Sequence, residues 1–579
     1  MALFDSLLHI KTDVLVIGGG IAAATAALEA VKTADVLLIS KDRVVGGASI
    51  QASGGITFPG AAGEESEVFI NDVLNGGEHI NNRLLVEKLC AEGRHLLDYL
   101  KDMGVIFDVH PDGNGLRFFK KTEGHSVMRN YQDRRNFHEF AGILKSNIVK
   151  SSVKVLEHTM VFSMICTEGK VSGALAYKAA DGAFVAVSAK TIILATGGYG
   201  RLYRRSDNSL GLTGEGHGMA LDCGVSLMDM EMVQFIPLSL PYPPGREGAF
   251  LGMCSLYGPK TELENALGER FMKRYDHVNM EYSTRDTVAR SIFREIAEGR
   301  GTPNGAVIVN TVKNDKTLLA AYRSSSAAAY SLIAEVFGEE AARWEKPFEA
   351  VPSQHFCMGG IEIDAKTQTG CENLYAAGEV SAGVHGANRL GGNAILEAFV
   401  FGRVSGQNAA EKALKEKSTS ENPEMNSVTE YWRNKFERFE SNAADKNSVS
   451  GQKIKLRISD ILWNHGSLLR SKSSLEAGLR QLENVGESMS NMAVLPGTRQ
   501  NSSVMEAMEA HYMYKVGKAV LMSALYREES RGAHYRYDFP EKNDAFLGNI
   551  LVNQDIGGIL KPFFRKIAAG GAAPKQFRL

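Results

Sequence analysis

The sequence predicts an α/β protein with an inserted domain and a helical C-terminal domain. An apolar run at residues 14–17 ends in three glycines, and an Ala-rich stretch with good helix propensity follows. A second apolar run at 35–39 completes a strand–turn–helix–strand unit. The glycine-rich character stops between 239 and 353 and then returns, which indicates an insertion. Beyond residue 428 helical periodicity dominates and glycines are few.

The composition excludes several classes of function. The 65 Lys and Arg residues nearly balance the 67 Asp and Glu residues, for a net charge of -2. This balance gives no support to a nucleic-acid partner. The six Cys residues are scattered without a C-x-x-C pair, so neither a disulfide scaffold nor a metal centre is expected. No apolar run approaches the roughly 18 residues of a membrane helix, and no signal-peptide pattern is present, so we expect a cytoplasmic protein.

The first glycine cluster matches a dinucleotide-binding fingerprint, Gly18-x-Gly20-x-x-Ala23. Its first glycine makes the turn, its second lets the backbone approach a pyrophosphate, and its small third residue permits close helix–strand packing. The helix that begins near Ile21 points its N–H groups at the phosphates. Ser40 and Lys41 stand where an NAD site usually carries an acidic residue, which disfavours a plain NAD site.

Further motifs follow in order along nearly the whole chain. They are the glycine cluster at 46–56 and the segments at 195–198, 213–220, 229–235, 268–272, 285–290, 355–360, 376–379, 384–393, 461–463 and 529–536. The longest reads Val384-His385-Gly386-Ala387-Asn388-Arg389-Leu390-Gly391-Gly392-Asn393. Together they resemble the flavoprotein subunits of fumarate reductase and succinate dehydrogenase, a family that includes L-aspartate oxidase.

This resemblance implies a domain organisation. An FAD-binding, Rossmann-like domain of the glutathione-reductase type is expected at residues 1–238 and 354–413. An α+β capping domain that covers the substrate is expected at 239–353, and a C-terminal helical domain with a tail at 414–579.

The resemblance also implies non-covalent FAD. Ala48 stands where the membrane-complex enzymes carry the His that attaches the flavin. Glu215 is expected to hold the adenosine ribose and Glu379 the ribityl chain. The N–H groups at the start of the helix after Asn393 would stabilise a negative, reduced flavin. The expected FAD contacts are Gly18, Gly20, Ile21, Ala22, Ser40, Lys41, Gly47, Ala48, Ser49, Ser53, Gly54, Gly55, Ala195, Thr196, Gly197, Glu215, Glu379, Asn393, Ala394 and Ile395.

The catalytic residues implied by the resemblance are His355, Arg389 and Arg285. His355 and Arg389 would grip a substrate carboxylate, and Arg285 would deliver a proton while flavin N5 carries the hydride. Paired hydrogen bonds from His and Arg polarise a C=C next to the carboxylate. No metal is expected to take part.

The chain departs from the family pattern at the second half of the substrate pocket. Ile236-Pro237-Leu238 replaces His-Pro-Thr, and Pro241-Tyr242 replaces the Thr-Glu pair, while Arg246 is displaced by one place. A carboxylate desolvated against Ile and Pro would cost several kcal/mol. The substitutions therefore favour an enoate with one carboxylate and an apolar tail over fumarate, with Ile236, Tyr242 and Arg246 as contacts. The alternative is that a neighbouring Arg or Ser rebuilds the pocket.

A second hypothesis is a flavin electron-transfer subunit with a repurposed pocket, either adenylylsulfate-reductase-like or partner-binding. The pocket substitutions motivate it, and the retained His355, Arg389 and Arg285 argue against it. In both cases the resemblance implies an iron–sulfur partner subunit, since the segment at 531–536 is similar to that of complex-forming members. Any contact with a membrane would then be indirect, through partner subunits.

Overall fold

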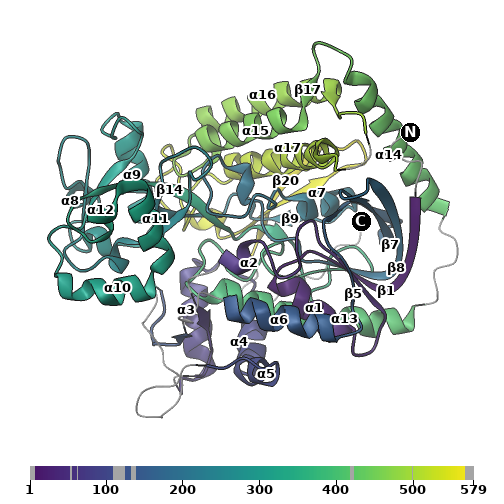
Figure 1. Cartoon of the computed structure of the whole chain (residues 1–579), viewed down its shortest axis with the longest axis horizontal. Coiled ribbons are helices and arrows are strands. Elements are labelled where there is room, and N and C mark those ends of the chain that lie inside the picture. Colours follow the sequence, from purple (N-terminus) through teal and green to yellow (C-terminus); the bar gives the residue numbers. More distant parts are fainter. Residues whose placement is uncertain are drawn as a thin grey trace.

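The central element of the computed structural model is a seven-stranded sheet (Figure 1). The structure describes residues 7–51, 55–61, 63–107, 124–131, 138–416, 423–497 and 500–567. The sheet has the order β5-β2-β1-β8-β7-β6, and β16 pairs with β8. Strands β5, β2, β1, β8 and β16 are parallel, and β6 and β7 extend the sheet in antiparallel fashion. The strands are β1 (Leu7–Ile17), β2 (Val36–Ile39), β5 (Lys154–Leu156), β6 (Thr159–Thr167), β7 (Lys170–Lys178), β8 (Ala183–Leu194) and β16 (Leu374–Ala376).

Two helices pack closely against this sheet and against each other. They are α1 (Ile21–Ala30) and α13 (Asn393–Lys415). Gly406 of α13 lies so near α1 that an added Cβ would come within 2.3 Å of the Ala26 carbonyl oxygen. The Ala-rich sequence of α1 and the glycines of α13 therefore permit a helix contact that larger side chains would prevent.

Further elements of the N-terminal half are α2 (Ala48–Gln51), β3 (Ile56–Thr57), α3 (Ser66–Gly76), α4 (Arg83–Gly93), α5 (Leu96–Asp102), β4 (Asn130–Tyr131), α6 (His138–Lys150) and α7 (Glu215–Asp222). Among them, α4, α5 and β3 contact α13, whereas α6 packs against α1 and α7 against α17 (Ser502–Tyr526). Strands β3 and β4 pair with each other. Helices α3 to α6 lie together in the lower part of Figure 1.

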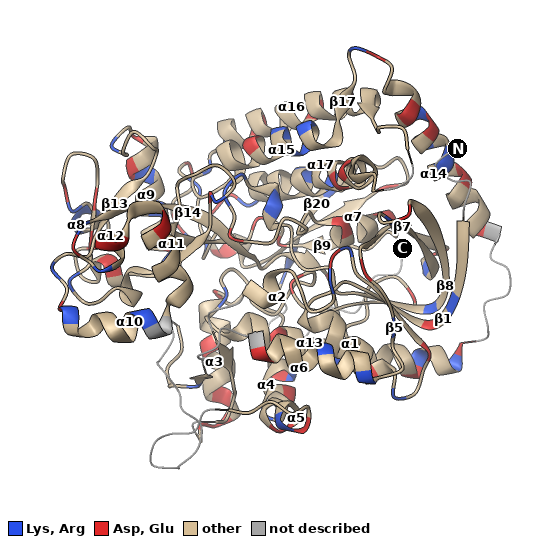
Figure 2. Cartoon of the chain, viewed as in Figure 1, with Lys and Arg blue, Asp and Glu red and all other residues tan. Residues whose placement is uncertain are grey.

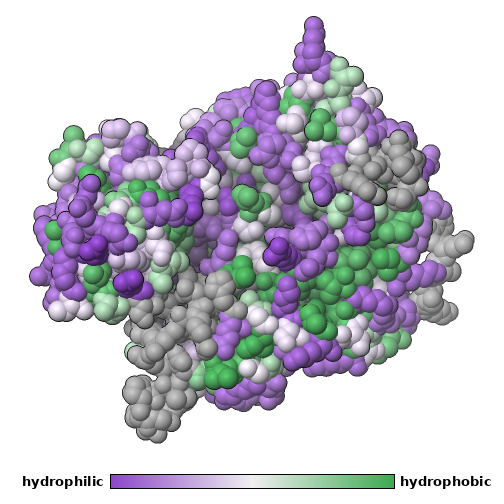
Figure 3. Space-filling model, in the orientation of Figure 1, coloured by the Kyte–Doolittle hydropathy of each residue, from purple (hydrophilic) through white to green (hydrophobic). Residues whose placement is uncertain are grey.

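The inserted segment forms a lobe with its own core. Its sheet has the order β11-β10-β14-β13-β12, and buried aromatic residues such as Tyr257, Trp344 and Phe348 fill the lobe. In the space-filling view the lobe is set off from the main body by a notch (Figure 3). Its elements are β10 (Val233–Ser239), β11 (Phe250–Gly252), β12 (Glu262–Glu264), α8 (Met272–Tyr275), α9 (Arg285–Ala297), β13 (Val307–Asn310), α10 (Leu319–Ser325), α11 (Ala327–Phe337), α12 (Glu339–Ala342) and β14 (Phe348–Cys357). The boundaries expected at 238/239 and 353/354 fall inside β10 and β14, which run continuously between lobe and body.

The C-terminal region is helical but ends in strands. The helices are α14 (Pro423–Asn442), α15 (Gly451–Gly466), α16 (Lys472–Ser488) and α17 (Ser502–Tyr526), with a short parallel pair β17 (Val449–Ser450) and β18 (Met492–Ala493). A hairpin of β19 (Gly548–Gln554) and β20 (Leu560–Lys566) then joins β9 (Leu227–Met228) and β15 (Gly360–Ile361) in one sheet. The sequence pattern of residues 414–579 did not predict this hairpin.

Charges of both signs are interspersed over the elements in view (Figure 2). Among the described helices, none is both long and apolar enough to cross a membrane.

Candidate active site

The turn after β1 can be built only with glycine at its first position. Gly18 has a φ of +138°, and a Cβ there would lie 2.1 Å from the carbonyl oxygen of Ala195. The backbone N–H of Ile21 then opens α1 and donates to the Ser49 hydroxyl at 3.1 Å. The predicted fingerprint and the predicted Ser49 contact therefore meet at one helix N-terminus, where a phosphate group is stabilised.

Lys41 follows β2 next to the glycine turn, where a Cβ on Gly19 would meet the Ser40 hydroxyl, and it belongs to a buried ion network. Its Nζ lies 2.6 Å from Glu215 and 3.0 Å from Glu509 of α17, and it donates to the Thr213 hydroxyl at 3.0 Å. Burial alone would lower the pKa of Lys41, but the two carboxylates outweigh burial and raise it. Lys455 of α15 pairs with Glu509 from the other side. Glu215, expected at the adenosine ribose, is thus oriented by Lys41.

The flavin end of the predicted site holds buried polar groups. Both side-chain polar atoms of Asn393 and the hydroxyl of Thr196 are buried without a hydrogen-bond partner within the described protein. Glu379 accepts the backbone N–H of Cys357 at 3.0 Å, and burial raises the pKa of Glu379 to about 7. Gly392 caps α13 with a φ of +83° and places the N–H groups of Asn393, Ala394 and Ile395 at the free end of the helix.

These observations fit a large ligand with hydroxyl, amide and phosphate groups. Buried polar atoms are normally satisfied, so the Asn393 and Thr196 atoms indicate ligand contacts. A Cβ at Gly55 would meet the carbonyl oxygen of Tyr131, whereas Gly47 has no atom within 4 Å of such a Cβ. Ser53 and Gly54, also predicted as contacts, lie outside the described residues. The donor set and the glycine cradle suit FAD.

The substrate part of the site begins with His355 on β14. Its Nδ1 lies 2.6 Å from Oδ2 of Asp207, whose side chain is only 7% exposed. Burial lowers the pKa of His355, Asp207 opposes this effect, and Arg389 and Arg285 lower the pKa further. The ring of Phe250 stacks on His355 with centroids 6.0 Å apart. His355 is therefore held by a carboxylate on one side and an aromatic ring on another.

Arg389 lies within the longest motif and is buried. Gln234 on β10 accepts from its Nη2 at 2.8 Å and its Nε at 3.2 Å. The guanidinium lies 4.8 Å from the centroid of the Phe356 ring. Burial, followed by the charge of Arg285, lowers the pKa of Arg389 to about 9. A buried guanidinium next to a second one is stabilised by an anion, so this arrangement favours carboxylate binding.

Arg285 is the first residue of α9 and completes the group. Its Nε lies 3.2 Å from the sulfur of Met253. The charge of Arg285 lowers the pKa of both His355 and Arg389. The contacts agree, because Phe250 stacks on His355 while nearby Met253 contacts Arg285, and Phe356, next to His355, contacts Arg389. The three predicted catalytic side chains therefore lie in one region. Arg285 comes from the inserted lobe, while Arg389 comes from the body. We call His355, Arg389 and Arg285 the carboxylate clamp.

The three predicted pocket residues are placed differently. Ile236 is buried on β10, two residues after Gln234. It pairs across the sheet with Ser353, which lies two residues before His355 on β14. Tyr242 instead packs on Phe337 of α11, and burial and Glu349 raise its pKa to about 12. The Tyr242 hydroxyl hydrogen-bonds to Glu349, at the start of β14. Glu349 is six residues from His355 along this strand, at about 3.3 Å per residue, so Tyr242 lies far from the clamp.

Arg246 pairs with Glu335 of α11 at 2.9 Å, and both side chains are about half exposed. The structure therefore brings neither Tyr242 nor Arg246 to the clamp. The physical reason is the course of the loop after β10, which lies against α11 rather than against β14 near His355. Sequence alignment with the family pattern could not reveal this change of direction.

Sequence reasoning missed the partners of the clamp. Asp207, which holds His355, and Met253, which contacts Arg285, lie in segments without a recognisable motif. Phe250, which stacks on His355, was not predicted as a contact. Gln234 lies in a quoted motif, but its role could have been found only from the pairing of β10 with β14. The signal for Asp207 was weak: one acidic residue in the basic stretch 201–207.

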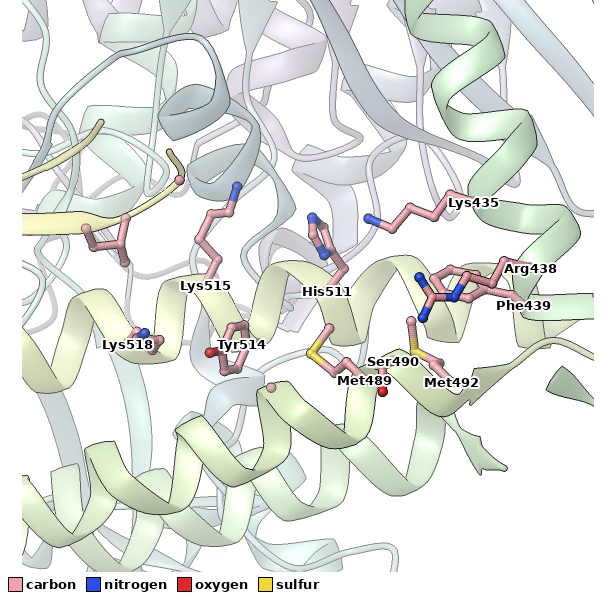
Figure 4. A pocket seen from close by; sticks show the side chains of 13 residues that line it. Lys435, Arg438, Phe439, Met489, Ser490, Met492, His511, Tyr514, Lys515 and Lys518 are labelled. Atoms are coloured by element: carbon pink, nitrogen blue, oxygen red, sulfur yellow. The ribbon is translucent and has the colours of Figure 1, made fainter. Parts of the chain in front are cut away.

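A separate cavity of about 390 Å³ lies between α14, α17 and the turn of the β19–β20 hairpin. It is rich in basic side chains, namely Lys435, Arg438, Lys515 and Lys518. Figure 4 shows the Lys435 side chain extending toward His511, and burial lowers the pKa of Lys435 to about 8. None of the predicted FAD or substrate residues lines this cavity.

Comparison with known proteins agrees with the site. Residues 13–395 match the FAD binding domain family, and residues 455–558 match the fumarate reductase flavoprotein C-terminal family. The fumarate reductase (CoM/CoB) of Methanothermobacter marburgensis has one subunit that is 34% identical over 553 residues, covering 94% of this chain and 97% of that protein. A solved E. coli quinol fumarate reductase chain superposes with a TM-score of 0.89 at 24% identity, covering 98% of this chain and 99% of that chain.

Adenylylsulfate reductase from Archaeoglobus fulgidus also superposes, with a TM-score of 0.76 at 19% identity, covering 99% of this chain and 98% of that chain. A likeness at this identity shows the fold alone. The adenylylsulfate-reductase-like alternative is therefore supported less well than the main hypothesis.

The fold and the site define an FAD-dependent oxidoreductase that acts on CH–CH groups. The chain belongs to the fumarate reductase and succinate dehydrogenase flavoprotein family, as its motifs predicted. The predicted fold class and the predicted cofactor, FAD, are thereby confirmed. The similar Methanothermobacter protein is, by its name, one subunit of a larger enzyme.

Proposed function

We propose that this chain is the flavoprotein subunit of an enzyme that interconverts an α,β-unsaturated carboxylic acid and its saturated form. The observation that carries the proposal is the clamp, in which His355, Arg389 and Arg285 converge from β14, the body and the inserted lobe. Three such groups at one place form a site for a carboxylate. The Methanothermobacter relative is named a fumarate reductase, which supports the same reaction class.

Each residue of the clamp has a distinct role in this proposal. Protonated His355 and Arg389 donate to the substrate carboxylate and draw electron density from the adjacent C=C. Arg285 holds the proton that is delivered to the α-carbon. FAD, when bound, supplies or accepts the hydride. Asp207 and Gln234 orient the donors and do not touch the substrate.

We further propose an apolar tail on the substrate rather than a second carboxylate. Phe250 and Met253 flank the clamp, and Ile236 is buried within two residues of it. A second carboxylate against such side chains would lose hydration without gaining a hydrogen bond, which costs several kcal/mol. Arg246, the expected remnant of the second grip, is paired with Glu335 instead.

The test is an anaerobic reoxidation experiment. The bound flavin is photoreduced, and its absorbance is followed after addition of fumarate or of enoates with one carboxylate and a larger tail. Reoxidation by tailed enoates and not by fumarate supports the proposal. Rapid reoxidation by fumarate contradicts the apolar-tail argument but keeps the reaction class. If no enoate reoxidises the flavin, the electron-transfer subunit with a repurposed pocket is favoured.

We also propose an iron–sulfur partner subunit. The support is the family and the word subunit in the relative's name. The segment at 531–536 does not itself offer a docking surface, because Arg531, His534 and Arg536 are buried. Arg531 pairs with Glu529, and Arg536 pairs with Asp538. Copurification from the native source, followed by iron and sulfide analysis, tests this partner.

A further inference from the structure

Three of the six cysteines meet at one place away from the clamp. Cys166 lies near the end of β6, Cys223 caps the C-terminus of α7, and Cys371 lies in the turn before β16. The sulfur atoms of Cys166 and Cys371 are 3.5 Å apart, and the thiol of Cys166 also points at the carbonyl oxygen of Cys223, 3.9 Å away. The other three cysteines are buried elsewhere, in α4, the lobe and β14.

The backbone holds Cys166 and Cys371 side by side. The turn after β6 and the turn that contains Cys371 are hydrogen-bonded to each other. The N–H of Glu372 donates to the carbonyl oxygen of Gly169 at 2.7 Å. The N–H of Val171 donates back to the carbonyl oxygen of Glu372 at 3.0 Å. A disulfide has a sulfur–sulfur distance of about 2.0 Å. The two sulfur atoms therefore need only a small side-chain movement to bond.

The three thiols are unequal in exposure. Cys166 is partly exposed, whereas Cys223 and Cys371 are 8% and 2% exposed. Hydrogen bonds from Cys223 and then Cys371 hold the pKa of Cys166 below its usual value, and the pKa values of those two partners are raised. The thiolate is the form that reacts with oxidants. A small oxidant therefore meets the more reactive thiol first, with a resolving thiol next to it.

We propose that Cys166 and Cys371 form a reversible, peroxide-sensitive disulfide. The Cys166 thiol is oxidised by hydrogen peroxide to a sulfenic acid, with release of one water. The Cys371 thiol then attacks the Cys166 sulfur, a second water leaves, and the S–S bond forms. A dithiol reductant returns two electrons and two protons and restores both thiols.

The bond would join two parts of the chain that are 205 residues apart in sequence. It would tie β6 to the turn that leads through β16 toward Glu379. Closing a long loop restricts the unfolded chain, so the oxidised protein should melt several degrees above the reduced protein.

The first test uses the FAD-bound full chain treated with hydrogen peroxide, then denatured and alkylated. We expect two fewer alkylated thiols, a Cys166–Cys371 linked peptide in a non-reducing digest, and full reversal by dithiothreitol. Cys90→Ser is the matched control and should form the same link. The proposal is overturned if all six thiols stay alkylatable at doses that convert exposed Met to sulfoxide, or if the link joins another pair.

A second experiment does not depend on the disulfide itself. In a Cys223→Ser, Cys371→Ser double variant, the sulfenic acid of Cys166 has no resolving thiol and should react with a 1,3-diketone probe. A Cys166→Ser variant should give neither probe labelling at this site nor the link. Absence of labelling in the double variant, with the flavin still bound, would count against Cys166 as the reactive thiol.

Discussion

Oδ2 of Asp207 lies 2.6 Å from Nδ1 of His355 and fixes which ring nitrogen faces the site. Asp207 accepts the Nδ1 proton, so in the neutral ring Nε2 carries no proton. Nε2 can donate to a carboxylate only after the ring takes up a second proton. The pair thus makes carboxylate binding and His355 protonation one event.

Replacing Asp207 tests its positioning role. In Asp207→Asn the amide still fills the space but no longer stabilises the imidazolium. We expect the KM for the carboxylic acid to rise about tenfold or more, with a smaller change in kcat, because ground-state and transition-state binding are both weakened. Steady-state kinetics measures this, with Asp102→Asn at the exposed C-terminal end of α5 as the control. A fall in kcat at unchanged KM would contradict the role.

Carboxylate binding should take up a proton. The pKa of His355 is lowered in the free protein by burial and by the two arginines, and a bound carboxylate raises it. The complex therefore binds more protons than the free protein, so affinity falls as the pH rises. Calorimetry in two buffers of different ionisation enthalpy counts the protons. A heat that does not depend on the buffer would exclude this mechanism.

A second pH effect is expected on the alkaline side. The pKa of Arg389 is lowered to about 9 by burial and Arg285, so its charge is lost as the pH rises through that value. We expect kcat/KM, which reports the free enzyme, to fall more steeply above pH 9, by up to a further tenfold per pH unit beyond the decline that deprotonation of His355 causes. In Gln234→Leu, which removes the carbonyl that faces Arg389, the steeper decline should begin at lower pH. An unchanged profile to higher pH would refute the assignment.

Arg285 should be needed for turnover and not for flavin binding. We expect Arg285→Ala to lower the rate of flavin reoxidation by substrate by at least about 100-fold, the usual contribution of a positioned proton donor. The flavin absorbance of the purified protein should be unchanged. Arg246→Ala is the control, because its side chain is paired with Glu335 away from the clamp. If both variants lose the same fraction of the reoxidation rate, Arg285 has no special role in turnover.

The flavin should leave the denatured protein. Ala48 begins α2 and has no nucleophilic atom, so we expect non-covalent FAD. Acid precipitation should release all of the yellow colour into the supernatant, where its absorbance is measured. Flavin that stays with the pellet after washing would show a covalent bond to another residue.

Local patterns predicted the parts of the fold that local rules govern. The glycines after β1 and the periodicity of α15 to α17 were readable because turn geometry and amphipathicity act over a few residues. The pairing of β10 with β14 joins segments more than a hundred residues apart, and no local rule specifies it. The β19–β20 hairpin was missed because β20 carries Pro562 and three charged residues, which obscure the alternation expected of a strand.

The site shows the same division. His355, Arg389 and Arg285 stand inside motifs whose order along the chain is informative, and the structure brings them together. Tyr242 and Arg246 were predicted only from their positions in a loop relative to the family motif. A loop can change its course while the number of residues between motif positions stays the same. Asp207 could not be predicted because its contact with His355 depends on tertiary structure alone.

The chain of alternating charges Glu215, Lys41, Glu509 and Lys455 crosses from the nucleotide side of the body into α17 and α15. Glu215 is the residue that we propose at the adenosine ribose, so binding of adenosine there would change the electrostatic balance of all four side chains. Cofactor loading and helix-bundle attachment would then be coupled equilibria. Stripping the flavin should loosen the C-terminal helices first, and calorimetry of the flavin-free protein should show two melting transitions where the loaded protein shows one.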